Sequence, residues 1–320
     1  EIPLRLVGSE MCIRDRLTVM ATVALLSTSL LAGCSSSGEN SNGGSNGGGT
    51  ATAAEVLANK NARAAISMII DKQAYCDVIL NNGSIPTSTF TPKGLAFDNG
   101  KDYTDLTEGM GYEYNEEQAK ELWEKAKEEV GFDTVEMELL TFDHDTGKRT
   151  GEYIQSELSD LEGLTVKVSN LPFKQKLERE TNGEFDLAFS GWGADYPDPL
   201  TYLSTMQTGN QFSNQVGYNS EEYNKLIEEA MKLPITEGYA KYAEAEKLML
   251  EDGYLAPIYQ KASAYLEKDY VSGIVNNSWG ADYTYTYADV DKDDKVLNLA
   301  TSSDLSLIHI SEPTRRRGIS

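Results

Sequence analysis

The segment from Val135 to Ser190 changes repeatedly between strand-like and helix-like patterns, and this order restricts the fold more than any other feature of the chain. Short runs rich in apolar and β-branched residues indicate strands, and segments with apolar residues at helical spacing separate these runs. The predicted elements are strands at 135–142, 164–171 and 185–190 and helices at 147–161 and 173–181. Strands that alternate with helices pair in parallel through right-handed crossovers. We therefore predict an α/β fold with a parallel βαβαβ core.

The last predicted strand leads into a turn, Gly191–Pro199, that reads Gly-Trp-Gly-Ala-Asp-Tyr-Pro-Asp-Pro. In open α/β sheets, ligands bind beyond the carboxyl ends of the strands. Gly191 and Gly193 have no Cβ, so a ligand can approach the backbone there. Trp192 offers a flat apolar face, and Asp195 places a carboxylate beside it. The turn predicts a site for an extended ligand with a positive end, such as a peptide with a free α-amino group. The alternative is an ordinary turn with a tryptophan in the core.

The charge and composition of the chain argue against several classes of function. Its 320 residues carry 28 basic and 51 acidic side chains, and the net charge of −23 disfavours binding to nucleic acid or to anionic lipid. Two histidines and three irregularly spaced cysteines do not suggest a metal site, a serine triad or a disulfide framework. The sequence contains no P-loop and no GxGxxG dinucleotide motif. We therefore expect no cofactor and no enzymatic activity.

Both ends of the chain look like translated sequencing adapter. Residues 10–15 can be encoded by a DNA sequence whose reverse complement, read in a shifted frame, encodes residues 305–310. Two unrelated termini would rarely show this relation by chance. We therefore treat residues 1–16 and 305–320 as adapter-derived and expect them to take no part in the fold.

The segment 17–34 resembles the signal peptide of a bacterial lipoprotein. It is apolar and uncharged up to Ala32, is too short to span a bilayer comfortably, and ends in Leu-Ala-Gly-Cys, with Cys34 as the residue that would carry lipid. The alternative is an ordinary secretory signal with an incidental cysteine. Residues 35–54 are rich in Ser, Gly and Asn, which indicates a flexible tether.

The remaining elements are predicted from apolar periodicity and capping residues. Further helices are expected at 61–71, 72–80, 116–130, 199–206, 221–231 and 237–250, and short strands at 255–259, 265–266 and 283–287. Asn115, Ser220 and Thr236 are the predicted caps of three of these helices. Cys76 is expected in the core. Asp143-His144-Asp145 is expected to form a polar turn, because three adjacent residues of an extended chain cannot all face one metal ion.

Four landmarks make the chain resemble the oligopeptide-binding proteins of ABC importers, which are family-5 solute-binding proteins. They are residues 61–72, 183–187, 191–199, and 242–246 together with 256–259. The resemblance covers about residues 61–287, and the last three landmarks together are highly specific. It implies a periplasmic-binding-protein-like (type II) lobe. Family members carry about as much chain again before the helix at 61–71, so the resemblance implies that the first lobe is largely missing and that residues 55–304 form the C-terminal peptide-binding lobe.

The resemblance also assigns roles within the turn. Asp195 falls on the aspartate that pairs with the peptide α-amino group, and Trp192 falls on a tryptophan that lines the pocket. Gly191 and Gly193 fall on backbone that pairs with the peptide main chain, and Ala194 belongs to the same binding motif. Some members carry a basic residue for the peptide carboxylate where this chain has Phe189, which leaves the carboxylate anchor unassigned.

The expected function is therefore a monomeric, lipid-anchored receptor outside the cytoplasm, in the periplasm or at the cell surface. It binds oligopeptides and hands them to the permease subunits of an ABC transporter in the cell membrane, without a chemical step. One alternative is a secreted enzyme that uses Asp195 and Asp198 on a glycoside. We favour Asp198 as a helix cap instead, because Pro197 and Pro199 hold both carboxylates in one turn. Another alternative is a structural lobe that binds nothing.

Overall fold

The structure is a computed structural model that describes residues 7–13, 49–262, 266–277, 279 and 283–299. The chain divides into two units, Glu1–Ala264 with Ser278–Asp282 and Tyr265–Asn277 with Tyr283–Ser320. The second unit contains two antiparallel strand pairs. They are β10 (Val271–Ser272) with β13 (Asp289–Val290), and β11 (Val275–Asn276) with β12 (Tyr283–Thr284). The first unit contains the predicted α/β core, and all that follows concerns it.

The predicted βαβαβ core is confirmed. Its elements are β6 (Phe132–Phe142), α5 (Asp145–Leu158), β7 (Leu164–Leu171), α6 (Phe173–Asn182) and β8 (Leu187–Gly193). β6 lies in the middle and pairs in parallel with β7 on one edge and with β8 on the other. Helix α5 packs very close to the sheet, because a Cβ on Gly147 would lie 2.4 Å from the Phe142 carbonyl oxygen.

The strand β1 (Val7–Ile13) lies between β8 and β9 (Leu255–Gln260) and is antiparallel to both. The expectation that residues 1–16 take no part in the fold therefore does not match the structure. Strand pairing uses backbone N–H and C=O groups, which every sequence offers, and without β1 the facing edges of β8 and β9 would lack a partner strand. The adapter origin of these residues stays a prediction. Two short strands extend the sheet: β2 (Gly49–Ala51) pairs with β6, and β3 (Ile85–Pro86) pairs with β9.

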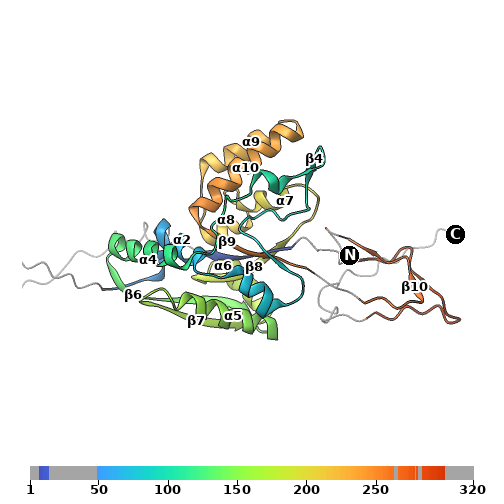
Figure 1. The fold of residues 1–320 in the computed structure, drawn as a ribbon, viewed down its shortest axis with the longest axis horizontal. Helices are drawn as coiled ribbons and strands as arrows, with labels where there is room; N and C mark the ends of the chain where they lie inside the picture. The colour runs from blue at the N-terminus through green and yellow to red at the C-terminus, as the bar shows by residue number, and fades with distance from the viewer. Residues whose placement is uncertain (1–6, 14–48, 263–265, 278, 280–282, 300–320) are drawn as a thin grey trace, which may run out of the picture. The chain divides into compact units, whose positions relative to one another are not determined.

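Helices cover both faces of the sheet. Alternate strand residues enter two different cores, since Leu187 and Phe189 of β8 belong to one and Ala188 to the other. The first core contains α1 (Ala53–Ala58), α2 (Lys60–Met68), α4 (Glu116–Val130) and α5. The second contains α7 (Leu200–Leu203), η3 (Ser204–Met206), α8 (Gln211–Val216), α9 (Glu221–Ala230) and α10 (Ile235–Asp252). Figure 1 shows α9 and α10 on one side of the sheet and α5 on the other.

The structure tests the predicted caps and boundaries. The side chains of Asn115 and Ser220 accept hydrogen bonds from the first turns of α4 and α9, as predicted. The Thr236 prediction is wrong, because its hydroxyl donates to Asp98 at 2.7 Å and α10 begins after Pro234. The helix predicted at 72–80 is divided into α3 (Lys72–Ala74) and a π-helix, η1 (Tyr75–Leu80). The strand predicted at 283–287 is only β12, and that at 265–266 begins at a residue outside the described ranges.

The loop between β3 and β4 (Phe97–Asp98) is held to α10 by one buried carboxylate. Glu246 is completely buried and accepts hydrogen bonds from the backbone N–H groups of Phe90 at 2.8 Å and Thr91 at 3.0 Å. It also accepts from the hydroxyls of Thr91 at 2.7 Å and Tyr103 at 3.0 Å. Burial raises the pKa of Glu246, against the opposing effect of these donors. After β4 the chain continues through β5 (Lys101–Asp102) and η2 (Tyr103–Leu106).

Candidate functional site

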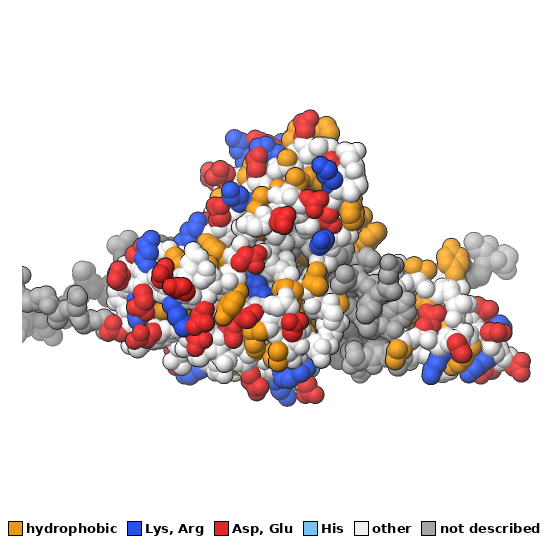
Figure 2. All heavy atoms as spheres, in the orientation of Figure 1, with side chains coloured by type: hydrophobic (Ala, Val, Ile, Leu, Met, Phe, Trp, Pro, Cys, Tyr) orange, Lys and Arg blue, Asp and Glu red, His pale blue; other side chains and the backbone are white. Residues whose placement is uncertain are grey.

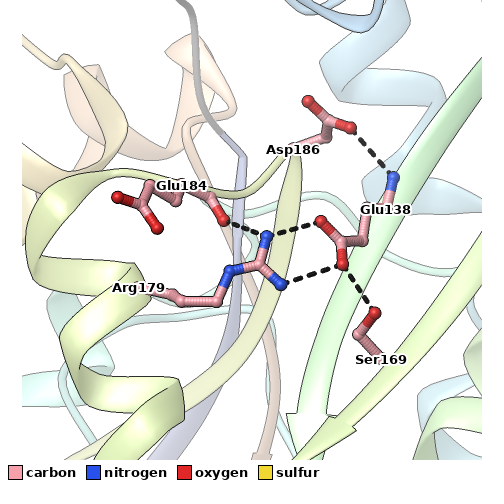
Figure 3. A network of polar contacts seen from close by, with 5 residues as sticks. All are labelled: Glu138, Ser169, Arg179, Glu184 and Asp186. Atoms are coloured by element: carbon pink, nitrogen blue, oxygen red, sulfur yellow. Dashed lines mark hydrogen bonds and ion pairs between the residues drawn. The ribbon is translucent and has the colours of Figure 1, made fainter.

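A polar network fixes helix α6 beside the sheet (Figure 3). The Arg179 guanidinium forms a bidentate pair with the Glu138 carboxylate of β6, with N–O distances of 2.9 and 2.7 Å, and donates to the Glu184 carbonyl at 2.7 Å. Ser169 of β7 also donates to Glu138, at 2.6 Å, and the Glu138 N–H donates to Asp186 at 2.9 Å. A planar, two-point contact fixes orientation as well as distance. The network therefore positions the other side of α6, which faces the candidate site.

A cavity of about 200 Å³ lies at the carboxyl ends of β6 and β8. β6 ends at Phe142, whereas β8 continues to Gly193, so beyond Ala188 it has no pairing with β6. The cavity is lined by Phe142, Phe173, Leu177, Glu180, Ser190, Gly191, Trp192, Gln211, Phe212 and Gln215. The cavity therefore lies at the strand ends beyond which the sequence predicts a ligand site.

The walls of the cavity are largely aromatic. Trp192 contacts Phe212 edge to face, with 5.7 Å between ring centroids, and Phe142 stacks on Phe173 at 6.2 Å. The backbone carbonyl of Trp192 accepts a hydrogen bond from the Tyr202 hydroxyl at 3.2 Å, which helps to fix the residue. Its indole Nε1 is covered and has no hydrogen-bond partner among the described residues. Such walls suit an apolar or planar group of a ligand.

One polar cluster interrupts these aromatic walls. The Lys176 ammonium is 1% exposed; it pairs with Glu180, donates to the Ser190 hydroxyl at 3.0 Å, and lies 4.4 Å from the centre of the Phe142 ring. The Ser190 hydroxyl in turn donates to Glu180 Oε1 at 2.6 Å. The sequence analysis did not single out Lys176 or Glu180, because a Lys–Glu pair four residues apart on a helix is normally exposed to solvent. Their spacing from Phe173 and Leu177 could have indicated a common face of α6.

Asp195 is exposed and lies just beyond the end of β8. Its backbone N–H donates to the Thr201 hydroxyl at 3.1 Å, but its carboxylate has no hydrogen bond or ion pair with a described residue. Asp198 differs, since its carboxylate accepts from the Leu200 N–H at 2.9 Å and burial raises its pKa. It contacts the first turn of α7, but the cap position itself is Pro199, one residue after the predicted one. The two carboxylates of this turn therefore have different roles.

The other predicted site residues are placed as follows. Gly191 lines the cavity with Trp192, whereas Gly193, Ala194 and Asp195 do not, and Ala194 is buried in the second core. Gly191 and Gly193 are also paired with β1, so one edge of their backbone faces another strand. Phe189 is buried and stacks on Tyr259 in the first core, on the other face of the sheet. It supplies no group to the cavity.

A second cavity, of about 480 Å³, lies beside β3 and the end of β9. Lys72 lines it, although the residue is only 3% exposed, and its ammonium donates to the Tyr112 carbonyl at 2.6 Å. Burial lowers the pKa of Lys72 to about 8, against the opposing effect of Glu113. Four acidic side chains line the same cavity: Asp71, Asp105, Glu108 and Glu113.

The described residues give limited information on metal sites and on the anchor. Within them, no group of three or more His, Cys, Asp or Glu side chains could hold a metal ion, and no helix is both long and apolar enough to cross a membrane. His144 caps α5 by accepting the Gly147 N–H at 3.0 Å, in agreement with the predicted polar turn. Cys76 is buried, as predicted, and burial raises its pKa to about 12. Cys34 lies outside the described residues.

Comparison with known proteins identifies the family. The family described as bacterial extracellular solute-binding proteins, family 5 Middle, matches residues 38–214. The chain belongs to this family. It is 31% identical over 238 residues to the dipeptide-binding protein of Lactococcus lactis subsp. cremoris (strain MG1363), covering 72% of this chain and 43% of that protein. It is also similar to the structure titled "Listeria monocytogenes OppA bound to peptide", with a TM-score of 0.72 and 30% identity over 90% of this chain and 49% of that one.

A third relative is matched over a similar share of its own length. The substrate-binding domain of an oligopeptide ABC transporter from Bacillus anthracis str. Ames gives a TM-score of 0.74 and 30% identity, over 91% of this chain and 51% of that structure. The chain thus spans about half the length, or less, of the relatives that it matches. The family confirms the expected α/β binding-protein fold, and it is a family of solute-binding proteins rather than enzymes. The alternative of a glycoside-cleaving enzyme is therefore abandoned.

Proposed function

We propose that this chain is the peptide-binding lobe of an extracytoplasmic receptor for an ABC importer. The observation that carries the proposal is the Asp195 carboxylate, which has no hydrogen bond or ion pair with a described residue and lies just beyond the strand end where Trp192 lines a cavity. A carboxylate whose two oxygens both accept hydrogen bonds from its own protein has little acceptor capacity left for a ligand. The named relatives support this function, since one is a dipeptide-binding protein and another was determined bound to peptide.

The geometry suggests how a peptide would lie. Its α-amino group would pair with Asp195, and a side chain would enter the cavity between Trp192 and Phe173. Gly191, which also lines the cavity, would let the peptide main chain approach β8. Figure 2 shows acidic and basic side chains interspersed over the visible face, without a large basic area that would indicate a nucleic-acid partner.

The proposal includes the transport context. Permease subunits in the cell membrane would receive the peptide from a monomeric receptor, and the receptor would be held at the membrane by lipid on Cys34. The support for the anchor is the uncharged apolar run that ends in Leu31-Ala32-Gly33-Cys34. No cofactor is required, because no bond of the peptide is broken.

The test of the proposed site is Asp195→Asn, measured in a chain completed with the preceding half of a full-length relative. A two-lobed receptor closes on its ligand and excludes water, and a charge-assisted hydrogen bond then contributes roughly 1.5–3 kcal/mol. Asp195→Asn should therefore weaken binding of a free-amine tripeptide by about ten- to a hundred-fold in calorimetry. The chain alone leaves Asp195 in solvent, where an ion pair contributes only about 0–1 kcal/mol, so we expect it to bind peptides more weakly than micromolar.

The control variant is Asp133→Asn, because Asp133 is exposed at the opposite end of the sheet and should leave the affinity unchanged. An N-acetylated peptide should bind poorly and lose little affinity on Asp195→Asn. Equal losses for the free and acetylated peptides would show that Asp195 has a structural role. Micromolar binding by the chain alone would show that the second lobe is not needed.

The test of the anchor is Cys34→Ser. Lipid chains contribute about 0.8 kcal/mol for each buried CH₂, so two or more chains hold a protein stably at a membrane. The variant should lose incorporation of radioactive fatty acid and should leave the membrane fraction. Cys76→Ser is the matched control, since Cys76 is buried and should not affect labelling. Unchanged labelling of Cys34→Ser would refute the lipobox assignment.

A further inference from the structure

The Glu180 carboxylate in the wall of the Trp192 cavity accepts hydrogen bonds from described residues through only one of its two oxygens. Glu180 is only 5% exposed and lines the cavity. Its Oε1 accepts from both Lys176 and Ser190, whereas its Oε2 has no hydrogen bond with a described residue. Oε2 is not among the fully covered side-chain atoms that lack a partner, so it is accessible. A ligand that covered it without offering a donor would leave it unsatisfied, which is costly. The cavity therefore presents an acceptor that a donor on the ligand can satisfy.

The charge of this acceptor is already compensated. Lys176 does not line the cavity; its ammonium lies behind Glu180 and is held by Glu180, Ser190 and the face of Phe142. A ligand carboxylate would have no proton to offer Oε2 and would meet another negative oxygen. A ligand ammonium would add a second positive charge to a pair that is already neutral. The wall therefore matches a group that is uncharged and donates a hydrogen bond.

Two further amides favour a group that can also accept. Gln211 and Gln215 line the cavity; Gln215 is 4% exposed, and its side chain makes no hydrogen bond with a described residue. The other lining residues include the flat rings of Phe142, Phe173 and Trp192. A planar carboxamide can stack on such rings, donate to Glu180 and accept from a glutamine. The cavity of about 200 Å³ has room for it, since one of about 150 Å³ is enough for benzene.

We propose that this cavity selects a ligand side chain that is uncharged and ends in an N–H or O–H donor, with a carboxamide such as that of glutamine as the best fit, and that Glu180 is the residue that determines this specificity. The proposal rests on the proposed peptide-binding function, since it concerns a side chain of the same ligand. An isosteric carboxylate should be rejected by Glu180 Oε2, and an aliphatic side chain should leave this oxygen without a donor. One buried hydrogen bond of this kind corresponds to about ten-fold in affinity.

The experiment uses the chain as it stands and three capped amino acids as probes: the N-acetyl methylamides of glutamine, glutamate and norleucine. They have no α-amino group, so their binding does not need Asp195. Binding is followed by NMR of the indole N–H signals of the three tryptophans, with Trp192 assigned from Trp192→Phe. We expect the glutamine probe to shift the Trp192 signal with a Kd at least about ten-fold lower than those of the other two probes.

Glu180→Gln should reverse the preference, because it removes the carboxylate that pairs with the Lys176 ammonium, and this positive charge can then attract the glutamate probe. Glu178→Gln is the matched control, since Glu178 is exposed on the same helix and does not line the cavity. Should Glu180→Gln fail to fold, the double variant Lys176→Met/Glu180→Gln removes the pair as a unit. It should reduce the discrimination between glutamine and glutamate to within about two-fold.

Three results would overturn the proposal. They are similar binding of all three probes to the native chain, a preference that persists in the Glu180 variants, and no shift of the Trp192 signal by any probe. The proposed function fails separately, if free-amine peptides bind equally well with and without the Asp195 carboxylate. A chain that binds such peptides through Asp195 but does not discriminate among the capped probes would be a peptide receptor without the specificity inferred for Glu180.

Discussion

Two proline-containing loops each lie beside one carboxylate, and these two carboxylates differ strongly in burial and in the number of hydrogen bonds that they accept. In the loop between β3 and β4, the backbone and side chain of Thr91 and the backbone of Phe90 surround Glu246, which is completely buried and accepts four hydrogen bonds. In the turn after β8, Asp195 is exposed and its carboxylate accepts none from a described residue. The first carboxylate fastens a loop to a helix, and the second is available to a ligand.

Because of this difference, we choose candidate ligand-binding carboxylates by their unused acceptor capacity rather than by their burial. Glu180 lies between the two extremes, because it is buried but uses only one of its two oxygens. On burial alone it would be grouped with Glu246. By the number of unused carboxylate oxygens, however, Glu180 resembles Asp195. For this reason we propose that both carboxylates bind the same ligand.

The largest effect should come from removing the fully used carboxylate. Glu246→Ala leaves four donors without their acceptor, and each unsatisfied buried group costs about 1–3 kcal/mol, so the free energy of unfolding should fall by about 4 kcal/mol or more. Glu244→Ala, on the exposed side of the same helix, is the control and should cost less than about 1 kcal/mol. Urea unfolding measures both. If Glu246→Ala lowers the free energy of unfolding by less than about 1 kcal/mol, Glu246 does not hold the loop to α10 as proposed.

A smaller effect should come from the buried Lys72 ammonium, which has only one hydrogen-bond partner among the described residues. The pKa of Lys72 is lowered from 10.5 to about 8, so between these values the unfolded chain holds a proton that the folded chain has released. The free energy of unfolding should therefore rise with pH from about 8 to about 10.5, by about 3 kcal/mol in total, with no contribution from Lys72 to the slope at lower pH. Lys72→Met should lack this rise. The measurement is the difference between the two proteins across this window, which cancels the titration of tyrosines.

The smallest effect should come from Asp195→Asn on stability. Its carboxylate has no partner among the described residues, so the free energy of unfolding should change by less than about 0.5 kcal/mol. The same variant is expected to lose peptide affinity in the completed receptor. A loss of stability of about 1.5 kcal/mol or more in urea unfolding would mean that Asp195 has a structural contact, and the contrast with Glu246 would no longer hold.

The parts of the fold with strong local patterns were predictable. The strand at 164–171 matches β7, and the helix at 173–181 differs from α6 by one residue, because apolar periodicity and flanking turns determine both. Helix α8 was missed, since Gln211–Val216 is short and mostly polar. Strand β1 was excluded because residues 1–16 look like translated adapter, and its pairing depends on two strands far along the chain. Tertiary context of this kind is not visible in a local pattern.

The candidate site was predictable only in part. The turn after β8 was located correctly, because glycines, a tryptophan and prolines follow a strand end. The walls of the cavity come from segments separated in sequence, at Phe142, Phe173 and Phe212, and only the fold brings them together. The Lys176–Glu180 pair was invisible for a different reason: its spacing is that of an ordinary surface ion pair, and only packing under Phe142 shows that it is buried.

Strand β1 also has a mechanical consequence. In the described sheet, β1 pairs with β8 along one edge and with β9 along the other, so backbone continuity between the β6–β7–β8 part and the β9–β3 part runs through its seven residues. Force applied along the chain beyond Ile13 would load both rows of hydrogen bonds at once. Once β1 leaves, the two parts of the described sheet share no hydrogen-bonded strand, and the contacts that remain between them include that of Phe189 with Tyr259. A single strand, β1, therefore connects the two parts of the described sheet by hydrogen bonds.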